Sequence, residues 1–600
     1  MKSNIDPITF EVIKSSLDML ADEMALVVMR TAYSHIIRDA FDYSTAVCDS
    51  KGRFIAQGLT NPIHLGSFPD AMKRVVSEYG ANAVQGDIYI FNDPYGSGGM
   101  HLPDIFFIKP VFLENTLVGY ACSMGHMADI GGIAPGSMAL YASEIYQEGL
   151  RIPLMKVFDA GKKNTTLFQL IEKNVRVPTE VLGDIDALIG ACNCCEIGLM
   201  QLVKRHGIND FENYIEYLHD YAERLMRAEI IKMPNGVYEF EDWLDGLGDK
   251  PEPVRFKTKI TIDGDSIKID WDGTSVQLKA AINTPLPTTN SMGYLAIRCM
   301  AKSPIPNCEG FIRPITVSAP LGSIVNPTEP AACASRGIVA YRMLDTMFGA
   351  LAKVAPERIP AACEGGPTSN QISCTHEGKR YVTGGGILGC WGGRFHLDGL
   401  DGVSNPGANM SNQPIELMEA SVPMAVTRYG LVENSGGPGQ SRGGYAVIRE
   451  YKILTDEAEL HVRSDRRSIL PYGLQGGLPG TPSWNIINAG LKQYALPVCP
   501  MRPVSLKKGD RFLHIQAGGG GHGNPLKRLP EKVLEAYLNE MITNEYAAEV
   551  YGVIIYDEII DYIATKKRRK ELLMIGSLEL NHLKHFHLKT GVYPDLVEYR

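Results

Sequence analysis

Residues 254–271 read VRFKTKITIDGDSIKIDW. Apolar and polar side chains alternate through residues 254–262, Asp263 and Gly264 supply a turn, and the alternation returns in residues 267–271. Alternation with a period of two on both sides of an Asp-Gly pair is a strong short-range signal of a β-hairpin. The centre of the chain is therefore predicted to be β-structure.

The segments on both sides of this hairpin follow other patterns. Residues 165–235 have apolar side chains at helical spacing, which predicts helices. Residues 240–525 are β-rich with long Gly/Pro loops, and we predict a second hairpin from residues 445–454 and 459–463. Helical spacing returns in residues 530–575. This order predicts an α+β fold rather than alternating βαβ units.

The length of the chain predicts more than one domain. Six hundred residues exceed what one hydrophobic core usually serves. We predict a mixed α/β domain at residues 1–240, a β-rich domain with long Gly/Pro loops at 241–529 and a helical C-terminal segment at 530–600. The 61 glycines are about 10% of the chain, above the usual ~7%, and indicate tight turns or close backbone approaches.

The first 130 residues alternate between helix and strand signals. Asp6-Pro7 is a good start for a helix, and the apolar stripe that follows predicts that this helix ends near Ser34. Four short segments have strand patterns. They are residues 45–49, 53–57, 87–91 and 117–122.

Composition excludes several classes of function. The net charge of −9 predicts no general affinity for nucleic acid or for an anionic membrane. No signal-peptide pattern opens the chain, and no apolar run reaches the ~18 residues that cross a bilayer. Twelve cysteines lack a disulfide framework, which is typical of a reducing compartment. We therefore expect a cytoplasmic protein.

Two glycine-rich segments carry the residues with the clearest chemistry. Residues 92–104 read NDPYGSGGMHLPD and contain His101 and Asp104, while residues 123–132 read SMGHMADIGG and contain His126. Each segment follows a predicted strand, so both loops are expected at the same end of neighbouring strands. Imidazoles with a carboxylate suit Mn, Fe or Zn with open coordination positions. Spacing alone leaves open that these histidines serve as turn and core residues.

Other motifs are interpreted as structural. No G-x-x-x-x-G-K-[ST] phosphate loop is present in the sequence. Gly518–Pro525 is more typical of a structural loop than of an anion-binding nest. Residues 192–195 are expected to be buried helix cysteines, residues 566–570 a solvated helix end, and the histidines of residues 582–587 a solvated tail.

Several sequence blocks, in order over residues 5–555, resemble one known family. The blocks are Asp6–Val12, His64–Ser67, Asn92–Tyr95, Gly98–Asp104, Gly125-His126, Pro178–Asp184, Arg313–Ile315, Asn326-Pro327 and Gly518–Pro525. Together they are similar to the hydantoinase B family. That family includes N-methylhydantoinase, the C-terminal halves of 5-oxoprolinases, caprolactamase, and the large subunits of acetone and acetophenone carboxylases.

The resemblance implies a divalent metal site. The family's His-x-x-Asp pair and later histidine match His101, Asp104 and His126, which are the predicted ligands and catalytic residues. Asp42, in the block Asp42-Tyr43-Ser44, is a fourth candidate ligand. Asp129 is a further predicted catalytic residue. His64 is expected beside the substrate.

One departure from the family pattern weakens any transfer of substrate identity. Many hydantoin-cleaving relatives read Glu-Arg-x-Asp-Phe-Ser where this chain reads DAFDYS at residues 39–44. The change adjoins Asp42, so it adjoins the predicted site.

The resemblance also implies a partner. A HyuA-like subunit, of the hydantoinase A type, would bind ATP and Mg and phosphorylate the carbonyl oxygen of a small-molecule substrate. The activated species would then reach the metal of this chain in a hetero-oligomer. The leading prediction is ring opening of a cyclic amide, either a hydantoin or a lactam.

Two alternatives stay open. One is a subunit of an ATP-dependent ketone carboxylase, with an additional small zinc-type subunit, and bicarbonate dependence separates it from the hydrolase. The other is a noncatalytic scaffold for the ATP-binding subunit, favoured only if the chain binds no metal.

Overall fold

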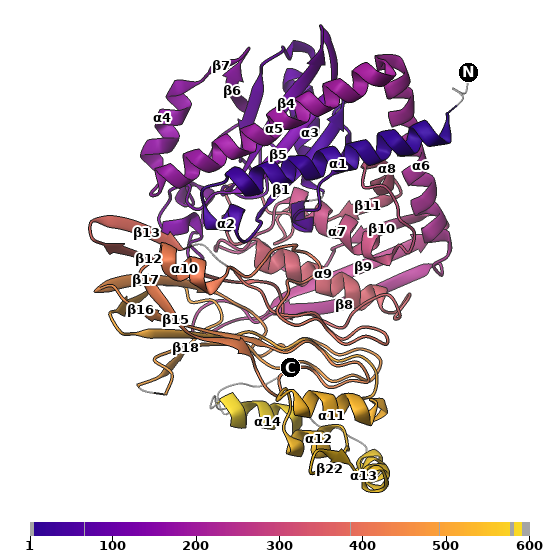
Figure 1. The fold of residues 1–600 in the computed structure, drawn as a ribbon, viewed down its shortest axis with the longest axis vertical. Coiled ribbons are helices and arrows are strands. Elements are labelled where there is room, and N and C mark those ends of the chain that lie inside the picture. Colours follow the sequence, from indigo (N-terminus) through magenta and orange to yellow (C-terminus); the bar gives the residue numbers. More distant parts are fainter. Residues whose placement is uncertain (1–4, 65, 384–385, 491, 576–580, 591–600) are drawn as a thin grey trace.

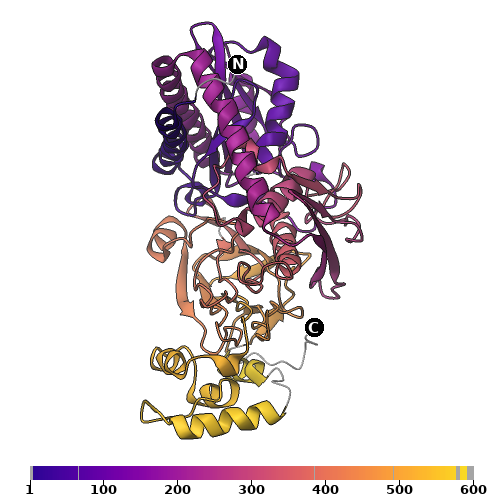
Figure 2. The same ribbon diagram turned by 90° about the vertical axis from the view of Figure 1, so that its right-hand side faces the viewer.

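The computed structural model describes residues 5–64, 66–383, 386–490, 492–575 and 581–590. The molecule is elongated, and successive parts of the chain follow one another along its long axis (Figures 1 and 2). The N-terminal sheet and its helices lie at one end, and the C-terminal helices lie at the other. The chain has a multi-domain α+β fold, as predicted. The described strands and helices do not follow one another as alternating βαβ units.

The N-terminal sheet contains strands far apart in sequence. Its strand order is β2-β1-β5-β4-β3-β6-β7. The strands are β1 (Tyr43–Asp49), β2 (Phe54–Gln57), β3 (Ile88–Phe91), β4 (Asp104–Leu113), β5 (Thr116–His126), β6 (Met155–Asp159) and β7 (Lys162–Lys163). All four predicted strands are present. The sequence patterns missed β4, which lies between β3 and β5 and pairs with both in antiparallel register.

Helices cover this sheet. The first, α1 (Pro7–Thr31), begins as predicted, because the Asp6 carboxylate accepts a hydrogen bond of 2.9 Å from the Thr9 amide. Its neighbours in the chain are α2 (His35–Arg38), α3 (Ser67–Tyr79), α4 (Thr165–Asn174), α5 (Pro178–His206) and α6 (Ile208–Ile231). Helices α1 and α5 pack against each other, α1 on β1 and α5 on β4 and β5.

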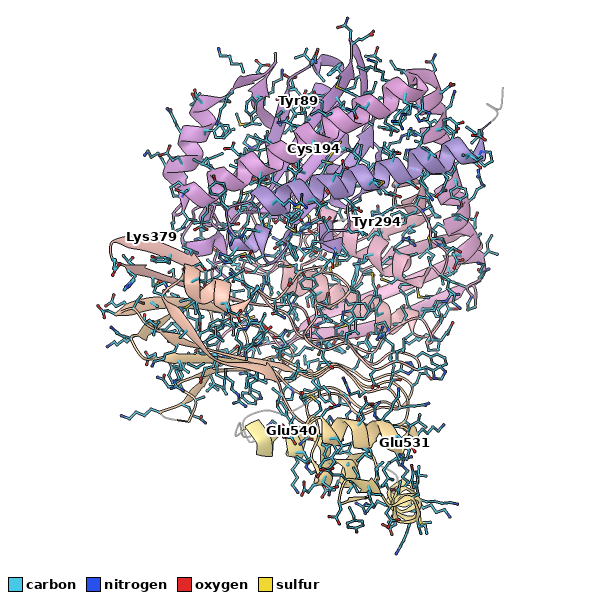
Figure 3. All side chains as sticks on the ribbon, viewed as in Figure 1. Tyr89, Cys194, Tyr294, Lys379, Glu531 and Glu540 are labelled. Carbon is cyan, nitrogen blue, oxygen red and sulfur yellow. The ribbon has the colours of Figure 1, made fainter. Side chains whose placement is uncertain are left out.

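Among the described residues, helix α5 is the one helix that is long and apolar enough to cross a membrane by length and average composition. Asp184, Asp186 and Glu196 interrupt it, so it contains no continuous apolar run of ~18 residues. Half of its most apolar window is buried inside the protein, where it contacts the sheet. Cys192 and Cys195 lie on its buried side, as expected for helix cysteines, and Cys194 is partly exposed (Figure 3). Packing on the sheet explains the apolar composition.

The predicted central hairpin is confirmed. Strands β9 (Val254–Asp263) and β10 (Ser266–Asp270) pair in antiparallel register. The turn consists of Gly264 and Asp265, one residue later than the predicted Asp263-Gly264, because Asp263 still pairs with Ser266. They belong to a sheet of order β11-β10-β9-β8, completed by β8 (Gly236–Leu244) and β11 (Ile315–Ser318). The inward side chains of β9 are buried, which is what the alternation predicted.

Helices inside residues 240–525 were not predicted. These are α7 (Leu286–Met300), α8 (Glu309–Ile312), α9 (Gly337–Leu351) and α10 (Ile415–Ser421). Every residue of α9 is buried, including Arg342, Asp345 and Thr346, so the helix has no face exposed to solvent. One hydrophobic core contains Leu17 of α1, Ile260 of β9 and Val339 of α9, so residues on both sides of 240 share it. The three-part division of the chain stays a prediction.

Two five-stranded sheets follow, and they correct the second predicted hairpin. In one sheet the order is β13-β12-β17-β20, with β14 paired to β12; in the other it is β15-β16-β21-β18-β19. The strands are β12 (Thr368–His376), β13 (Lys379–Thr383), β14 (Gly386–Ile387), β15 (Met424–Leu431), β16 (Val447–Ile453), β17 (Glu457–Arg463), β18 (Trp484–Ile487), β19 (Tyr494–Leu496), β20 (Val504–Lys507) and β21 (Arg511–Ile515). Both predicted strands exist, but β16 pairs with β15 and β21, while β17 pairs with β12 and β20. The hairpin prediction was wrong because the chain changes sheets between them.

Glycine-rich segments pack backbone against backbone beside these sheets. The amides of Gly519, Gly520 and Gly521 donate to the carbonyls of Gly444, Ala362 and Leu478, respectively. A methyl group on Gly443 would overlap the carbonyl oxygen of Gly519. The high glycine content therefore serves close backbone approach, as predicted. The amides of residues 518–521 all donate to carbonyls, so they form no anion-binding nest.

The C-terminal segment is helical with one small hairpin. It contains α11 (Pro530–Leu538), α12 (Asn544–Val550), β22 (Ile555–Tyr556), β23 (Ile559–Ile560), α13 (Tyr562–Ile575) and α14 (Asn581–Thr590). Glu531 and Glu540 mark its place at one end of the molecule, far from Tyr89 of the N-terminal sheet (Figure 3). Residues 576–580 and 591–600 of the predicted segment lie outside the described residues.

The tail histidines are not solvated, which corrects the sequence interpretation. His582, His585 and His587 are buried. The ring of His585 hydrogen-bonds the Glu549 carboxylate at 2.9 Å. The tail packs back onto the protein, and a polar segment at the end of a chain gives no signal of such packing.

Candidate metal centre

The pairing of β4 with β5 brings the predicted ligands together. Asp104 is the first residue of β4, His126 is the last residue of β5, and the two lie directly opposite each other in register. His101 lies in the loop that enters β4. The prediction that both glycine-rich loops share one edge of the sheet is confirmed. They are not on adjacent strands, however, because β4 separates β3 from β5.

The three side chains form a compact, buried cluster. His101 Nε2 lies 2.9 Å from Asp104 Oδ1, and His126 Nδ1 lies 3.1 Å from the same oxygen. The three candidate ligand atoms all lie within 4.8 Å of one another. Among the residues that the structure describes, this is the one group of histidine, cysteine and carboxylate side chains close enough to hold a metal.

A hydrogen bond fixes the tautomer of His101. Its Nδ1–H donates to the carbonyl oxygen of Ala334 at 2.6 Å, and a carbonyl can only accept. The other ring nitrogen, Nε2, then has no hydrogen to donate to Asp104 Oδ1, 2.9 Å away, and it is buried without a hydrogen-bond partner. A ligating histidine commonly uses one nitrogen for a carbonyl and the other for the metal. His101 is therefore oriented as a ligand.

The carbonyl of Ala334 is itself held in place by a buried carboxyl group. Glu148 Oε1 accepts hydrogen bonds from the amides of Cys333 (2.7 Å) and Ala334 (2.6 Å). Burial raises the pKa of Glu148 to about 8, despite the two amides. Glu148 is thus a neutral acid at pH 7, and it positions the loop that orients His101.

Arg336 controls the charge of the cluster. Its guanidinium pairs with Asp104 Oδ2, which leaves Oδ1 for the two histidines. Burial opposes the ionisation of Asp104, but the positive charge of Arg336 holds its pKa well below the usual range. Burial and then Arg336 lower the pKa of His101 to about 3. A neutral imidazole beside an ionised carboxylate is the protonation state that a metal site requires.

Asp42 lies at the edge of this cluster. Its Oδ2 is 3.9 Å from His126 Nδ1, and its Oδ1 accepts a hydrogen bond of 2.9 Å from the Asn61 amide group. Its backbone carbonyl also accepts from the His126 amide. Asp42 is close enough to face a metal through Oδ2, although it is not among the three tightest residues.

His64 and Asp129 occupy different places. His64 lies beside Asp42, with 3.9 Å between Nε2 and Oδ1, and its Nδ1 is 2.9 Å from the Ser44 hydroxyl. Burial lowers the pKa of His64. Asp129 is not brought to the cluster: its carboxylate pairs with Arg176 at 2.9 Å and accepts from the Gly131 amide. It stabilises the loop after β5.

A small cavity of about 80 Å³ opens beside the cluster. Its walls come from segments that the sequence separates widely. They include Asp42, His64, His101, His126, Arg336 and Arg463. Sequence reasoning missed Arg336 and Arg463, which lie in no motif. Arg336 is 232 residues from Asp104, so no local pattern could connect them.

Comparison with known proteins decides the family. The sequence model of the hydantoinase B/oxoprolinase family matches residues 6–525. This chain belongs to that family. Among hydantoinase B relatives, the B-type subunit of a candidate D-/L-hydantoinase of Pseudomonas sp. (strain NS671) is 34% identical, with 94% of this chain and 98% of the relative covered.

Two solved structures share the fold of this hydantoinase B family member. The crystal structure of the ATP-dependent caprolactamase from Pseudomonas jessenii has a TM-score of 0.87 and 29% identity, covering 95% of this chain and 100% of that chain. A nucleotide-free acetone carboxylase structure also has a TM-score of 0.87, with 18% identity, covering 96% and 84% of the two chains. At 18% identity this second likeness concerns the fold alone.

The residues of the cluster fit a divalent metal. Two imidazole nitrogens and one carboxylate oxygen are a borderline donor set that suits Mn, Zn or Fe. The buried Nε2 of His101 has no other partner, and leaving such an atom unpaired costs about 1–3 kcal/mol. A metal on Nε2 would remove that cost.

Proposed function

We propose that this chain is the metal-binding catalytic subunit of an ATP-dependent cyclic amide hydrolase, opening a hydantoin or lactam ring. One observation carries the proposal: the buried His101–Asp104–His126 cluster borders a cavity, and His101 Nε2 has no hydrogen-bond partner. The chain that contains this cluster aligns over nearly its full length with a candidate hydantoinase subunit. The metal ligands, and Asp42 as a fourth, are part of the proposal.

The side chains around the cavity would have different roles in the reaction. A bound divalent metal would supply Lewis-acid activation of a carbonyl or of water. His101 and His126 would hold it through imidazole nitrogens, and Asp104 as an anion kept ionised by Arg336. With Oδ1 of Asp42 held by Asn61, Oδ2 is left to contact the metal or accept a proton from the attacking water.

ATP and Mg would be bound by a partner of the hydantoinase A type. The sequence has no phosphate loop, and the caprolactamase of the same fold is named as ATP-dependent. The partner would phosphorylate the substrate's carbonyl oxygen, and the activated species would reach the cavity within the hetero-oligomer. A cytoplasmic location is part of the same proposal.

Ketone carboxylation, with an additional small zinc-type subunit, is the alternative. Its support from structure is the fold shared with acetone carboxylase at 18% identity. The hydrolase is supported by higher identities, 34% to the candidate hydantoinase and 29% to the caprolactamase. The hydrolase therefore stands first.

The test is a coupled assay on the complex of this chain with its partner. Hydantoins and lactams are supplied with ATP, with and without bicarbonate, and products are identified by mass spectrometry. We expect ring opening that requires ATP and both proteins, independent of bicarbonate. Bicarbonate-dependent carboxylation of a ketone would establish the alternative instead, and ring opening by the lone chain without ATP would contradict the coupled mechanism.

A variant separates the metal step from activation. His126→Ala should abolish the ring-opened product while leaving some substrate-dependent ATP hydrolysis, because activation takes place in the partner. The exposed His376, on β12 far from the cluster in sequence, provides the matched control. His376→Ala should retain full activity.

A further inference from the structure

Arg463 is a buried cation that faces the cavity beside the candidate metal centre. It is the last residue of β17, and only 9% of it is exposed. It lines the same cavity as His101 and His126, although it lies on a different sheet. Its position depends on the packing of β17 against β12, and no sequence motif marks it.

Arg463 differs from the other buried arginines around it. Arg336 pairs with Asp104, and Arg342 and Arg466 both pair with Asp242. Among the described residues, none forms an ion pair with the Arg463 guanidinium, and its Nε is buried without a hydrogen-bond partner. The carboxylate of Asp42 lines the same cavity and favours the charged form of Arg463 without pairing with it. Burial lowers the pKa of Arg463. An unpaired buried charge is costly unless a ligand compensates it.

The N-terminus of helix α9 is a second source of positive potential at the same cavity. Helix α9 begins at Gly337, which also lines the cavity. A methyl group on Gly337 would lie 3.8 Å from Nη2 and 3.9 Å from Nη1 of Arg463. The N-terminus of a helix carries a partial positive charge. The Ile338 and Val339 amides of α9 donate to the carbonyls of Ser335 and Arg336, so α9 contributes the positive end of its dipole rather than a row of unpaired amides. A guanidinium in contact with a helix N-terminus is electrostatically unfavourable, unless an anion lies beside both.

The other groups around the cavity leave room for such an anion. Asp42 faces the cavity, but it is held by Asn61 and lies beside the histidines. Ser369 and Gln371 line the wall near Arg463, and Gln371 donates to the Gly136 carbonyl. The cavity of about 80 Å³ far exceeds the ~10–15 Å³ that one water needs.

We propose that Arg463 and the N-terminus of α9 form an oxyanion-binding subsite next to the candidate metal centre. The subsite takes a phosphoryl or carboxylate group, and it holds the charged group of a substrate whose reacting carbon faces His101 and His126. The identity of the group rests on the proposed function: an activated amide would bring a phosphoryl group, whereas a carboxylation would bring a carboxylate. Arg463 acts by binding and takes no part in bond making.

The test measures anion binding by the full chain without its partner. Thermal shift and isothermal titration are run with inorganic phosphate and, separately, with bicarbonate. We expect phosphate to raise Tm and to bind to the wild-type chain, with affinity reduced at least tenfold in Arg463→Met. Arg463→Lys should retain part of the binding, and the exposed Arg502→Gln should bind as wild type.

Two further readouts keep a folding defect from being mistaken for a lost subsite. Arg463→Met should be at least as stable as wild type without anion, because it replaces a buried charge that has no ion-pair partner by an apolar side chain of similar size. Its metal content should be unchanged, since none of the three clustered residues is altered.

The outcomes separate the subsite from the proposed function. Bicarbonate binding that depends on Arg463, without phosphate binding, would support the subsite and contradict an activated amide as its ligand. Equal anion binding by wild type and Arg463→Met, or no anion binding by wild type, would overturn the subsite. The coupled assay could still succeed in that case, because it does not measure anion binding by the lone chain.

Discussion

At the residue scale, His101 and His126 are the side chains on which metal binding is expected to depend. Both face Asp104 within 3.1 Å, and Nε2 of His101 has no other partner. We predict that His101→Ala and His126→Ala each lower metal affinity by more than about 100-fold, since even a lost partner of a ligand costs 10–100-fold. Elemental analysis of purified protein measures this directly. Full occupancy in both variants would rule out the cluster as the metal site.

Glu148 gives a residue-scale prediction about pH. Because burial raises its pKa to about 8, the folded protein holds a proton that the unfolded chain releases near pH 4.5. The stability contributed by Glu148 is therefore fully present below about pH 4.5 and is lost as the pH rises to about 8. One pKa unit corresponds to about 1.4 kcal/mol.

Glu148→Gln should remove this pH dependence. A glutamine resembles the neutral acid and keeps the oxygen that accepts from Cys333 and Ala334. We expect the variant to match wild type at pH 5 and to be the more stable of the two at pH 8–9. Tm measured from pH 5 to 9 tests this, with Glu377→Gln as an exposed control. Parallel Tm profiles for Glu148→Gln and wild type would refute the neutral buried acid.

The sequence predicted part of the site at this scale. His101, Asp104 and His126 could be found because each stands in a glycine-rich motif, and Asp42 because it matches a family block. Arg336, Arg463 and Glu148 could not be found, since they reach the site through tertiary packing alone. Asp129 was selected from its nearness to His126 in sequence, but a strand end can direct neighbouring residues to different partners.

At the scale of elements, the glycine-rich segments predict an unusual sensitivity to a single methyl group. Gly443 contacts the backbone of Gly519, and a backbone carbonyl cannot rotate away as a side chain can. We predict that Gly443→Ala destabilises the protein by about 3 kcal/mol or more, at the upper end of overpacking effects. Tm and soluble yield report the loss.

Gly430 offers a matched control on β15. A methyl group there would meet no atom within 4 Å. Gly430→Ala should leave Tm within a degree or two of wild type, because ordinary exposed substitutions cost less than about 0.5 kcal/mol. Similar losses in the two variants would mean that backbone packing of the glycine segments does not limit stability.

A helix or strand could be predicted from sequence when one of its faces is buried and the other is exposed to solvent. The central hairpin and α1 alternate buried and exposed side chains, so their periodicity is visible in sequence. Helix α9 is buried on all sides, so its sequence does not separate a buried face from an exposed one. Strands β16 and β17 were visible, but which strands they pair with is decided by the long-range assembly of two sheets.

At the scale of the whole molecule, the sequence indicated an α+β chain, and the absence of a phosphate-loop motif led to the prediction that a partner binds ATP. The fold class followed from the order of patterns along the chain, and the family blocks followed one another over most of its length. The shared core across residue 240 did not follow, because it depends on α7 and α9, which pack between the N-terminal part and the β-rich part. Long-range packing of this kind has no local sequence signal.

The last prediction concerns nucleotide binding by the entire chain. A phosphate loop binds through unpaired backbone amides, and the sequence contains none of its pattern. The most glycine-rich alternative, residues 518–521, has every amide donating to a carbonyl of the neighbouring segments. We therefore expect isothermal titration of the lone chain with MgATP to show no binding, and the lone chain to hydrolyse no ATP. The complex with its partner, titrated under the same conditions, should bind MgATP. Micromolar binding by the lone chain would place a nucleotide site in this protein and remove the reason for assigning ATP to the partner.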